Sequence, residues 1–361
     1  MISYCKGQVT KIVATYPGCT ELEVRTPTGE RRAINYDLFT GVVQPGAEVL
    51  LNTTAVRLGL GSGGYHFVVA VNNSSKTMSP QQPHKSGGHI MKLRYTPLQF
   101  SVLSAEEENS PYHQLFHDFD SLNGLPVIIG ELHSMLLPAV FNIKRREPQL
   151  KVAYIMTDGG ALPAAFSRNL AYLKEQNLIQ GTITYGQAFG GDLEAVNIYT
   201  ALIAAQAVLK ADVAVVTMGP GITGTGTKYG WSGLEQGHII DAVNTLGGRP
   251  VFIPRISFAD KRPRHRGLSH HSITVLGEIA QTRADVVLPQ LAEDKYAYIL
   301  AQLKTHRLDQ KHKIVTVPNQ KEVLENIQHY KIKLTTMGRT LDQDPGFFLA
   351  AGSAGWYSAK Q

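Results

Sequence analysis

The runs Leu125-Pro126-Val127-Ile128-Ile129-Gly130, Val152-Ala153-Tyr154-Ile155-Met156-Thr157 and Val213-Ala214-Val215-Val216-Thr217-Met218 decide the fold. Each is almost unbroken in its apolar character, which is typical of a strand buried on both faces of a parallel sheet. Further strands are predicted at Gly181–Thr184, Pro250–Arg255, Asp285–Leu288 and Ile314–Val317. Helix-length segments lie between them at Ala161–Gln176, Leu193–Leu209, Gly233–Leu246 and Ile273–Thr282. This alternation predicts an α/β fold with a doubly wound, mostly parallel sheet.

A different pattern precedes these repeats. Residues 1–75 contain short runs rich in Val, Ile and Thr, separated by turn signals such as Pro17-Gly18. In one run, Leu22 and Val24 alternate with charged residues, as in a strand with one wet face. We therefore predict a small all-β, barrel-like domain. The composition then turns to Ser, Pro and Gln, which predicts a linker at 76–88 and an α/β domain at 89–361.

Composition narrows the class of protein. Of 361 residues, 43% are hydrophobic and 18% are charged, which excludes disorder over any large part of the chain. The low charge also suits a homo-oligomer that covers part of the surface. The formal net charge of +6 favours anionic ligands but is too small to indicate a nucleic-acid-binding protein.

Cysteine usage and hydropathy indicate the compartment. A hairpin turn at Tyr16–Cys19 would keep Cys5 away from Cys19, so no disulfide is predicted. The first residues lack the basic end and apolar run of a signal peptide. The most apolar stretch, 195–218, is interrupted by Lys210 and Asp212 after a run too short to cross a membrane. We expect a cytoplasmic protein that does not contact membranes.

Five successive strand ends carry glycines or ionisable residues. Parallel strands end at one edge of a sheet, and ligands of such sheets bind in the crevice beyond that edge. Glu131, Asp158, Gln187 and Asp192 follow the first three predicted strands. Asp158 suits a proton-transfer role, and Gln187 and Asp192 suit ligand contacts, although either aspartate would also cap a following helix. We therefore expect a site at this edge.

The longest of these strand-end segments is a glycine- and threonine-rich run. Gly219, Gly221 and Gly224 match G-x-G-x-x-G, but Ser232–Glu235 forms a predicted capping box that delays the helix. No acidic residue ends the following strand, so NAD binding is not expected. Glycines instead free backbone N–H groups for an anion, and threonine and lysine side chains add donors. The anion-binding candidates are Gly219, Gly221, Gly224, Thr225, Gly226, Thr227 and Lys228. The alternative is a purely structural loop.

A second segment, Lys261 to His271, holds four cations and three histidines. Arg264 and Arg266 would bind anionic oxygens, while His265, His270 and His271 would move protons. Alternatively, His265 with either His270 or His271 would join Asp158 or Asp192 around a divalent metal ion. Ser269 is a predicted N-cap, which places His270 and His271 in a first helical turn and predicts that only one of them faces the crevice. A solvated basic loop remains the alternative.

The stretches 218–237 and 264–272 also carry a resemblance. Met218-Gly219-Pro220-Gly221, Gly224-Thr225-Gly226-Thr227 and Arg266-Gly267-Leu268-Ser269-His270-His271 resemble the loops of an uncharacterised bacterial family, a domain of unknown function. The likeness extends over nearly the whole chain. It implies no activity and supplies no catalytic roles.

These features favour an enzyme, a transferase or hydrolase, that acts on a small phosphorylated or otherwise anionic metabolite such as a nucleotide. The alternative is a non-enzymatic module that senses a nucleotide or binds nucleic acid through the barrel and the basic segment. Few aromatic residues interleave the strands of the barrel, which argues against nucleic acid.

Overall fold

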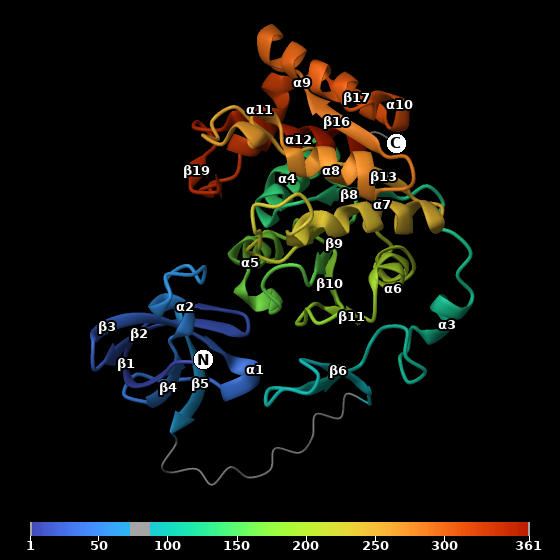
Figure 1. Ribbon diagram of the computed structural model, residues 1–361. Helices are drawn as coiled ribbons and strands as arrows, with labels where there is room; N and C mark the ends of the chain where they lie inside the picture. Colours follow the sequence, from blue (N-terminus) through green and yellow to red (C-terminus); the bar gives the residue numbers. More distant parts are fainter. Residues whose placement is uncertain (1, 73–86, 360–361) are drawn as a thin grey trace. The chain divides into compact units, whose positions relative to one another are not determined.

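The computed structural model describes residues 2–72 and 87–359 (Figure 1). It contains two compact units, and neither is continuous in sequence. The first comprises residues 2–72, 93–100 and 165–171, and the second comprises the other described residues. Most of the predicted linker, 76–86, lies outside the described residues, as do residues 73–75.

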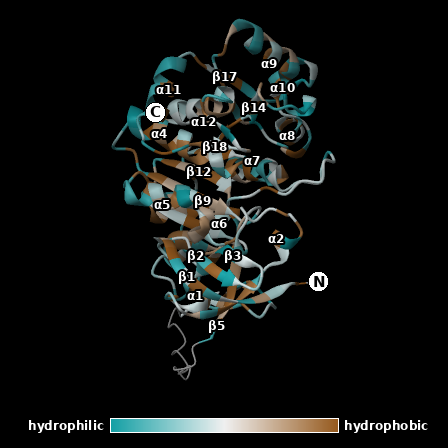
Figure 2. Ribbon diagram, turned by 90° about the vertical axis from the view of Figure 1, so that its left-hand side faces the viewer, coloured by the Kyte–Doolittle hydropathy of each residue, from teal (hydrophilic) through white to brown (hydrophobic). Residues whose placement is uncertain are grey.

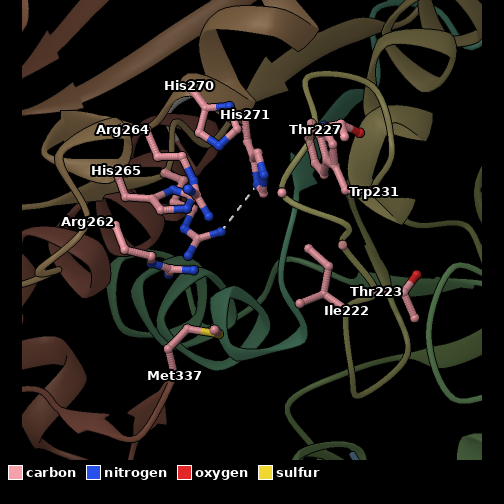
Figure 3. A pocket seen from close by; sticks show the side chains of 13 residues that line it. Ile222, Thr223, Thr227, Trp231, Arg262, Arg264, His265, His270, His271 and Met337 are labelled. Carbon is pink, nitrogen blue, oxygen red and sulfur yellow. Dashed lines mark hydrogen bonds between the residues drawn. The ribbon is translucent and has the colours of Figure 1, made fainter.

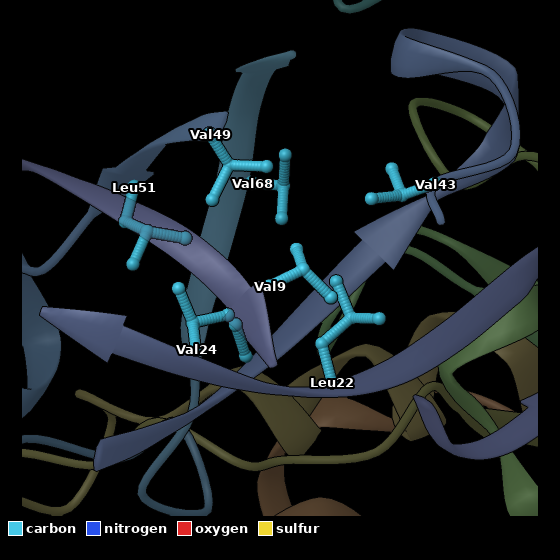
Figure 4. Close-up of a cluster of buried hydrophobic side chains, with 8 residues drawn as sticks. Val9, Leu22, Val24, Val43, Val49, Leu51 and Val68 are labelled. Atoms are coloured by element: carbon cyan, nitrogen blue, oxygen red, sulfur yellow. The ribbon is translucent and has the colours of Figure 1, made fainter. Parts of the chain in front are cut away.

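The first unit contains a closed five-stranded barrel, which confirms the predicted all-β start of the chain. Its strands, in the order β1-β2-β3-β5-β4, are β1 Tyr4–Tyr16, β2 Cys19–Thr26, β3 Gly29–Tyr36, β5 His66–Asn72 and β4 Glu48–Asn52. The short helices α1 Asp37–Thr40 and α2 Thr54–Arg57 connect them. Inward-facing side chains of alternating residues, Leu22 and Val24 among them, form the core (Figure 4).

One charged residue of β2 departs from the expected alternation. Glu21 is buried rather than exposed, because Arg168 and Arg32 pair with its carboxylate and the Tyr65 hydroxyl donates to it at 2.9 Å. These partners, all within the first unit, compensate the charge that burial would otherwise leave unsolvated.

The second unit is built on an eight-stranded sheet in which every pairing is parallel, so the predicted α/β fold is confirmed. Its order is β11-β10-β9-β12-β8-β13-β16-β17. The strands are β8 Pro126–Gly130, β9 Val152–Thr157, β10 Gly181–Tyr185, β11 Leu193–Ala195, β12 Val213–Met218, β13 Arg249–Phe252, β16 Asp285–Pro289 and β17 Lys313–Val317. The three runs that decide the fold form β8, β12 and β9, side by side at its centre.

Helices cover both faces of this sheet (Figure 2). The helix α12 Pro345–Ser358 packs on α4 Leu136–Arg146 and α11 Gln320–Gln328 over one face, and α6 Ile198–Ile203 packs on α7 Glu235–Thr245 over the other. The remaining helices are α3 His113–His117, α5 Arg168–Glu175, α8 His270–Thr274, α9 Glu293–Thr305 and α10 Leu308–Lys311. The short strands are β6 Ile90–Lys92, β7 Phe100–Val102, β14 Ile256–Ser257, β15 Gly267–Leu268, β18 Thr335–Thr336 and β19 Arg339–Thr340.

Two predicted helices begin later than expected. The helix expected from Ala161 begins at Arg168, because the preceding residues pack tightly under the loop that follows β12: a Cβ on Gly160 would lie 2.3 Å from the Gly219 carbonyl oxygen. Leu193–Ala195, expected to open a helix, instead adds the edge strand β11 beside β10. The helix then begins at Ile198, where Asn197 forms the capping box.

The strand order fixes where loops diverge. From β8 the chain moves to β9 on one side of the sheet, and from β12 it moves to β13 on the other. Connections that leave neighbouring strand ends in opposite directions open a crevice between them. The loops that follow β8, β12 and β13 therefore meet at this crevice.

Candidate functional site

Residues that follow β12 and β13 line one pocket of about 180 Å³ (Figure 3). This volume is smaller than the roughly 300–1,000 Å³ typical of pockets for drug-sized ligands. The loop after β12 contributes Ile222, Thr223, Gly224, Gly226, Thr227 and Trp231. The segment after β13 contributes Arg255, Arg262, Arg264, His265, His270 and His271, and Met337 completes the wall. The structure thus brings together the two segments in which the sequence predicts anion binding.

The glycine- and threonine-rich loop is held by its own hydrogen bonds. Gly224 and Trp231 form an antiparallel bridge, and the Thr225 N–H donates to the Gly230 carbonyl at 2.8 Å. The predicted capping box at Ser232–Glu235 does not form. The Ser232 hydroxyl accepts instead from the Thr223 N–H at 3.3 Å. The Glu235 carboxyl accepts a hydrogen bond from the Thr157 hydroxyl.

The segment after β13 folds back on itself. Its two short strands, β14 and β15, pair antiparallel, and the Ser269 N–H donates to the Arg255 carbonyl at 2.9 Å. The Ser269 hydroxyl then accepts from the His271 N–H, which confirms the predicted N-cap of α8. Arg255 and His271, sixteen residues apart in sequence, consequently lie in contact.

Positive charge dominates the pocket wall. Three arginines line it, whereas no carboxylate is among its lining residues. Arg255 donates to the buried Glu131 at 2.9 Å, and Arg262 forks onto Asp260 at 2.9 and 2.8 Å. Arg264 is exposed and forms no ion pair within residues 2–72 and 87–359. One guanidinium therefore remains without a counter-charge at the pocket.

The three histidines lie together, with ring centroids 4.3 to 5.1 Å apart. His265 Nδ1 is 2.8 Å from Ser269 Oγ, and His271 Nδ1 is 2.6 Å from Glu131 Oε1. His270 Nε2 is buried and has no hydrogen-bond partner in the described part of the chain. The expectation that only one of the adjacent histidines faces the crevice is wrong. Side chains in a first helical turn lean toward the N-terminus, so both reach the pocket beyond the helix end.

The surroundings keep two of these imidazoles neutral at pH 7. Burial, with the charges of Arg255 and Arg262, lowers the pKa of His265 to about 3. Burial, with His271 and Arg264, lowers the pKa of His270 to about 4. Burial raises the pKa of Glu131, but the hydrogen bond from His271 and the charge of Arg255 outweigh it, so the pKa falls below its ordinary value. Glu131 is therefore a carboxylate.

Several predicted ligand residues of the glycine-rich run lie outside the pocket lining. A Cβ on Gly219 would lie 2.2 Å from the Ala161 carbonyl oxygen, so this glycine permits close packing of two loops. Gly221 has φ of +100° and supplies a turn. The Thr225 hydroxyl hydrogen-bonds within its own loop, to Thr227 and Gly230.

Two predicted cationic ligands are engaged elsewhere. Lys228 forms an ion pair with Glu278. Arg266 lies over the ring of Tyr298, with its guanidinium carbon 5.9 Å from the ring centroid. Of the basic residues predicted to bind the anion, Arg264 alone is among the lining residues.

Asp158, Gln187 and Asp192 also lie away from the pocket lining. The Asp158 carboxylate accepts from the Gln187 N–H at 3.0 Å. Asp192 accepts from Thr182 and forms an ion pair with Lys174. Neither aspartate caps a helix, because α5 begins at Arg168 and β11 follows Asp192. Neither joins the histidine cluster as a metal ligand.

Sequence reasoning missed six residues that line the pocket, and it missed the role of Glu131 as a partner of Arg255 and His271. The six are Ile222, Thr223, Trp231, Arg255, Arg262 and Met337. Arg255 looked like the end of a strand, and Glu131 like one polar residue after an apolar run. Arg255 and His271, the two partners of Glu131, are 124 and 140 positions from it in sequence, so no local pattern indicates these contacts. Arg262 lies within the basic segment, and that charge cluster was its only signal.

Cys5 and Cys19 are both free thiols. Among the described residues, every helix is too short or too polar to be a membrane-spanning segment.

Comparison with known proteins agrees with the resemblance carried by the two loops. Residues 32–355 match the model of a family described as "Protein of unknown function (DUF3866)". Neither a curated protein nor a solved structure matches the chain. The matched region includes every residue of the pocket.

Proposed function

The chain belongs to the DUF3866 family, and we propose that this member is an enzyme whose pocket binds the phosphate or other anionic group of a small metabolite. The observation that carries the proposal is the charge of the pocket wall: among the described residues, three arginines line it and no carboxylate does. Guanidinium groups bind phosphate and carboxylate oxygens in forked geometry, and these bonds are stronger than neutral ones.

The position of the pocket supports the same proposal. It lies where connections leave the sheet in opposite directions, at the carboxyl ends of the strands, which is where open parallel sheets bind ligands. Gly224 and Gly226 line the pocket and carry no Cβ that would keep an anion from their backbone. The volume suits one small anionic group rather than a large cofactor.

The histidines supply the reactive groups of the proposed enzyme. A neutral imidazole offers one lone pair, which can accept a proton or ligate a metal ion. His265 and His270 are neutral because burial and nearby positive charges lower the pKa of each. His265 and His270 line the same pocket as Arg264, so an anionic substrate bound by Arg264 would sit near these imidazoles.

Thermal unfolding of the full chain in EDTA, with a panel of inorganic phosphate, sugar phosphates and nucleotides, tests anion binding. A ligand that binds only the native state raises Tm in proportion to the logarithm of its concentration. For the best ligand, we expect Arg264→Gln to weaken binding roughly 10- to 150-fold, since a charge-assisted hydrogen bond contributes about 1.5–3 kcal/mol.

Arg266→Gln is the matched control. It removes the same charge two positions away, from a side chain that lies over Tyr298 and outside the pocket lining. The proposal requires this variant to bind like the native chain. An equal loss of affinity in both variants, or no stabilisation by any anion of the panel, contradicts it.

A further inference from the structure

The geometry points to a metal site in the pocket, at which His265, His270 and His271 bind one divalent transition-metal ion such as zinc. The inference rests on the proposed function for its role in chemistry, but metal binding itself can be measured without any anion. The three residues each offer one ligand nitrogen, and these nitrogens all lie within 4.8 Å of one another. Figure 3 shows the three rings side by side at one wall.

The three side chains are close enough to bind one ion after a small adjustment. Zinc binds imidazole nitrogen at about 2.0–2.1 Å in tetrahedral geometry, so two nitrogens on the same ion are about 3.4 Å apart. The ligand nitrogens of the cluster all lie within 4.8 Å of one another. No pair therefore has to approach by more than about 1.4 Å, which rotation of the rings about their side-chain torsions would supply.

The second nitrogen of two rings is already engaged, as in known histidine sites. A ligating histidine usually donates its other ring N–H to a carboxylate or another oxygen, which fixes the ring and raises its basicity. Glu131 Oε1 accepts from Nδ1 of His271, and Ser269 Oγ lies 2.8 Å from Nδ1 of His265. Nε2 of each of these rings is then the ligand atom.

The third ring carries the observation that points most directly to a ligand. His270 Nε2 is buried and has no hydrogen-bond partner within the described residues. A buried polar atom without a partner is costly, and native structures rarely retain one without a reason. A metal ion bound at this nitrogen would satisfy it.

Charge and ligand type select the class of metal. The cluster contains nitrogen ligands alone, which favours zinc, copper, cobalt or nickel over magnesium and calcium, since the latter two prefer oxygen. Positive charge opposes a cation, but Glu131 offsets Arg255 and Asp260 offsets Arg262. An anion bound by Arg264 would lower the remaining repulsion.

The number of ligands indicates the role of the ion. Structural zinc sites use four protein ligands, whereas catalytic sites use three and leave a position for water or substrate. Here three histidines lie in the wall of a pocket that Arg264 also lines. The open position would therefore face the place where the proposed anion binds.

Cobalt titration of EDTA-treated, dialysed full-length protein tests the inference, with Co²⁺ alone as the probe. We expect one ion per chain and the intense visible absorption of four- or five-coordinate cobalt. His270→Ala should weaken binding at least 100-fold without lowering Tm of the metal-free protein, because within the described residues His270 Nε2 makes no hydrogen bond that the change would break. Glu131→Gln should weaken it about 10- to 100-fold.

His117→Ala is the matched control, since the side chain of this histidine is 75% exposed and pairs with the neighbouring Asp118. It should bind cobalt like the native chain. Failure of the native protein to bind cobalt overturns the inference, as does binding that His265→Ala, His270→Ala and His271→Ala all leave unchanged. Anion binding in EDTA that persists in either case leaves the proposed function standing. Cobalt binding without any anion binding removes the proposed function and retains the metal site.

Discussion

The indole of Trp231 lies flat on the imidazole of His271, with ring centroids 3.8 Å apart and planes 6° from parallel. Trp231 is itself held by a hydrogen bond from its Nε1 to the Lys228 carbonyl at 3.0 Å. The imidazole is thus fixed by Trp231 at its face and by Glu131 at its edge. A residue of the glycine-rich loop therefore orients a histidine that follows a different strand.

Replacement of Trp231 should disturb this orientation. We expect Trp231→Leu to weaken cobalt binding about tenfold, because groups that orient a metal ligand commonly contribute 10- to 100-fold in affinity. Trp231→Phe, which keeps an aromatic face against His271, should stay within about threefold of the native affinity. Cobalt titration of both variants is the measurement. Equal affinities for the leucine variant and the native chain would show that the stacking has no positioning role.

Glu235 makes the stability of the protein depend on pH. Burial, followed by the charge of Asp158, raises the pKa of this carboxyl to about 7, although the Thr157 hydroxyl bond opposes the rise. The native state therefore retains a proton that the unfolded chain releases above pH 4.5, and stability falls as pH rises toward 7. The full penalty, reached above pH 7, is at most about 3 kcal/mol.

Glu235→Gln should remove this dependence. We expect the free energy of unfolding of the variant to fall less between pH 5 and pH 8 than that of the native chain. Denaturant unfolding at pH 5, 6, 7 and 8 measures it, and Glu293→Gln, at an exposed position, is the control. Parallel curves for Glu235→Gln and the native chain would refute the prediction.

Lys92 is a fully buried lysine with three oxygen partners. Its Nζ donates to the carbonyls of Gly186 and Ala188 at 3.0 and 2.9 Å, and lies 3.1 Å from Glu194 Oε2. Lys92→Met should cost roughly 3–5 kcal/mol, because it leaves Glu194 buried without its cation. Lys174→Met, which breaks the exposed pair with Asp192, should cost less than about 1 kcal/mol. Urea unfolding measures the free energy of unfolding of both variants. A similar loss in the two would contradict the prediction that the buried ion pair of Lys92 contributes more to stability.

Gly219 and Gly224 lie in the same loop, but only Gly219 is expected to be needed for packing. A Cβ on Gly219 would lie 2.2 Å from a backbone oxygen of Ala161, whereas a Cβ on Gly224 would meet Trp231 at an ordinary 3.5 Å. We expect Gly219→Ala to destabilise the protein by about 1–3 kcal/mol, as overpacking does, and Gly224→Ala to change stability little. Thermal unfolding of the two variants is the measurement. A larger loss of stability in Gly224→Ala than in Gly219→Ala would contradict the packing described.

The sheet could be predicted because a strand that is buried on both faces is apolar along its whole length. The runs of β8, β9 and β12 need no partner to be recognised, since each is apolar throughout. β11 was missed because it is a three-residue strand directly before a helix of similar composition. Its pairing with β10 is a tertiary contact, which local propensity does not encode.

The site was predictable only as two segments. Glycines after a strand and a cluster of arginines and histidines are visible in sequence, and both segments line the pocket. The residues that pair with these two segments, and so set their charge and orientation, are not visible in the sequence. Glu131 meets Arg255 and His271 through the arrangement of β8 beside β13, and Asp158 was assigned a role from its place after β9 alone.

The place of β12 between β8 and β9 has a consequence for biosynthesis. As the chain leaves the ribosome, β8 to β11 emerge before β12, the strand that lies between β8 and β9 in the finished sheet. The middle of the sheet thus closes through contacts between residues far apart in sequence, which form slowly. Both segments of the pocket follow that closure, so ligand binding would report that the nascent protein has matured.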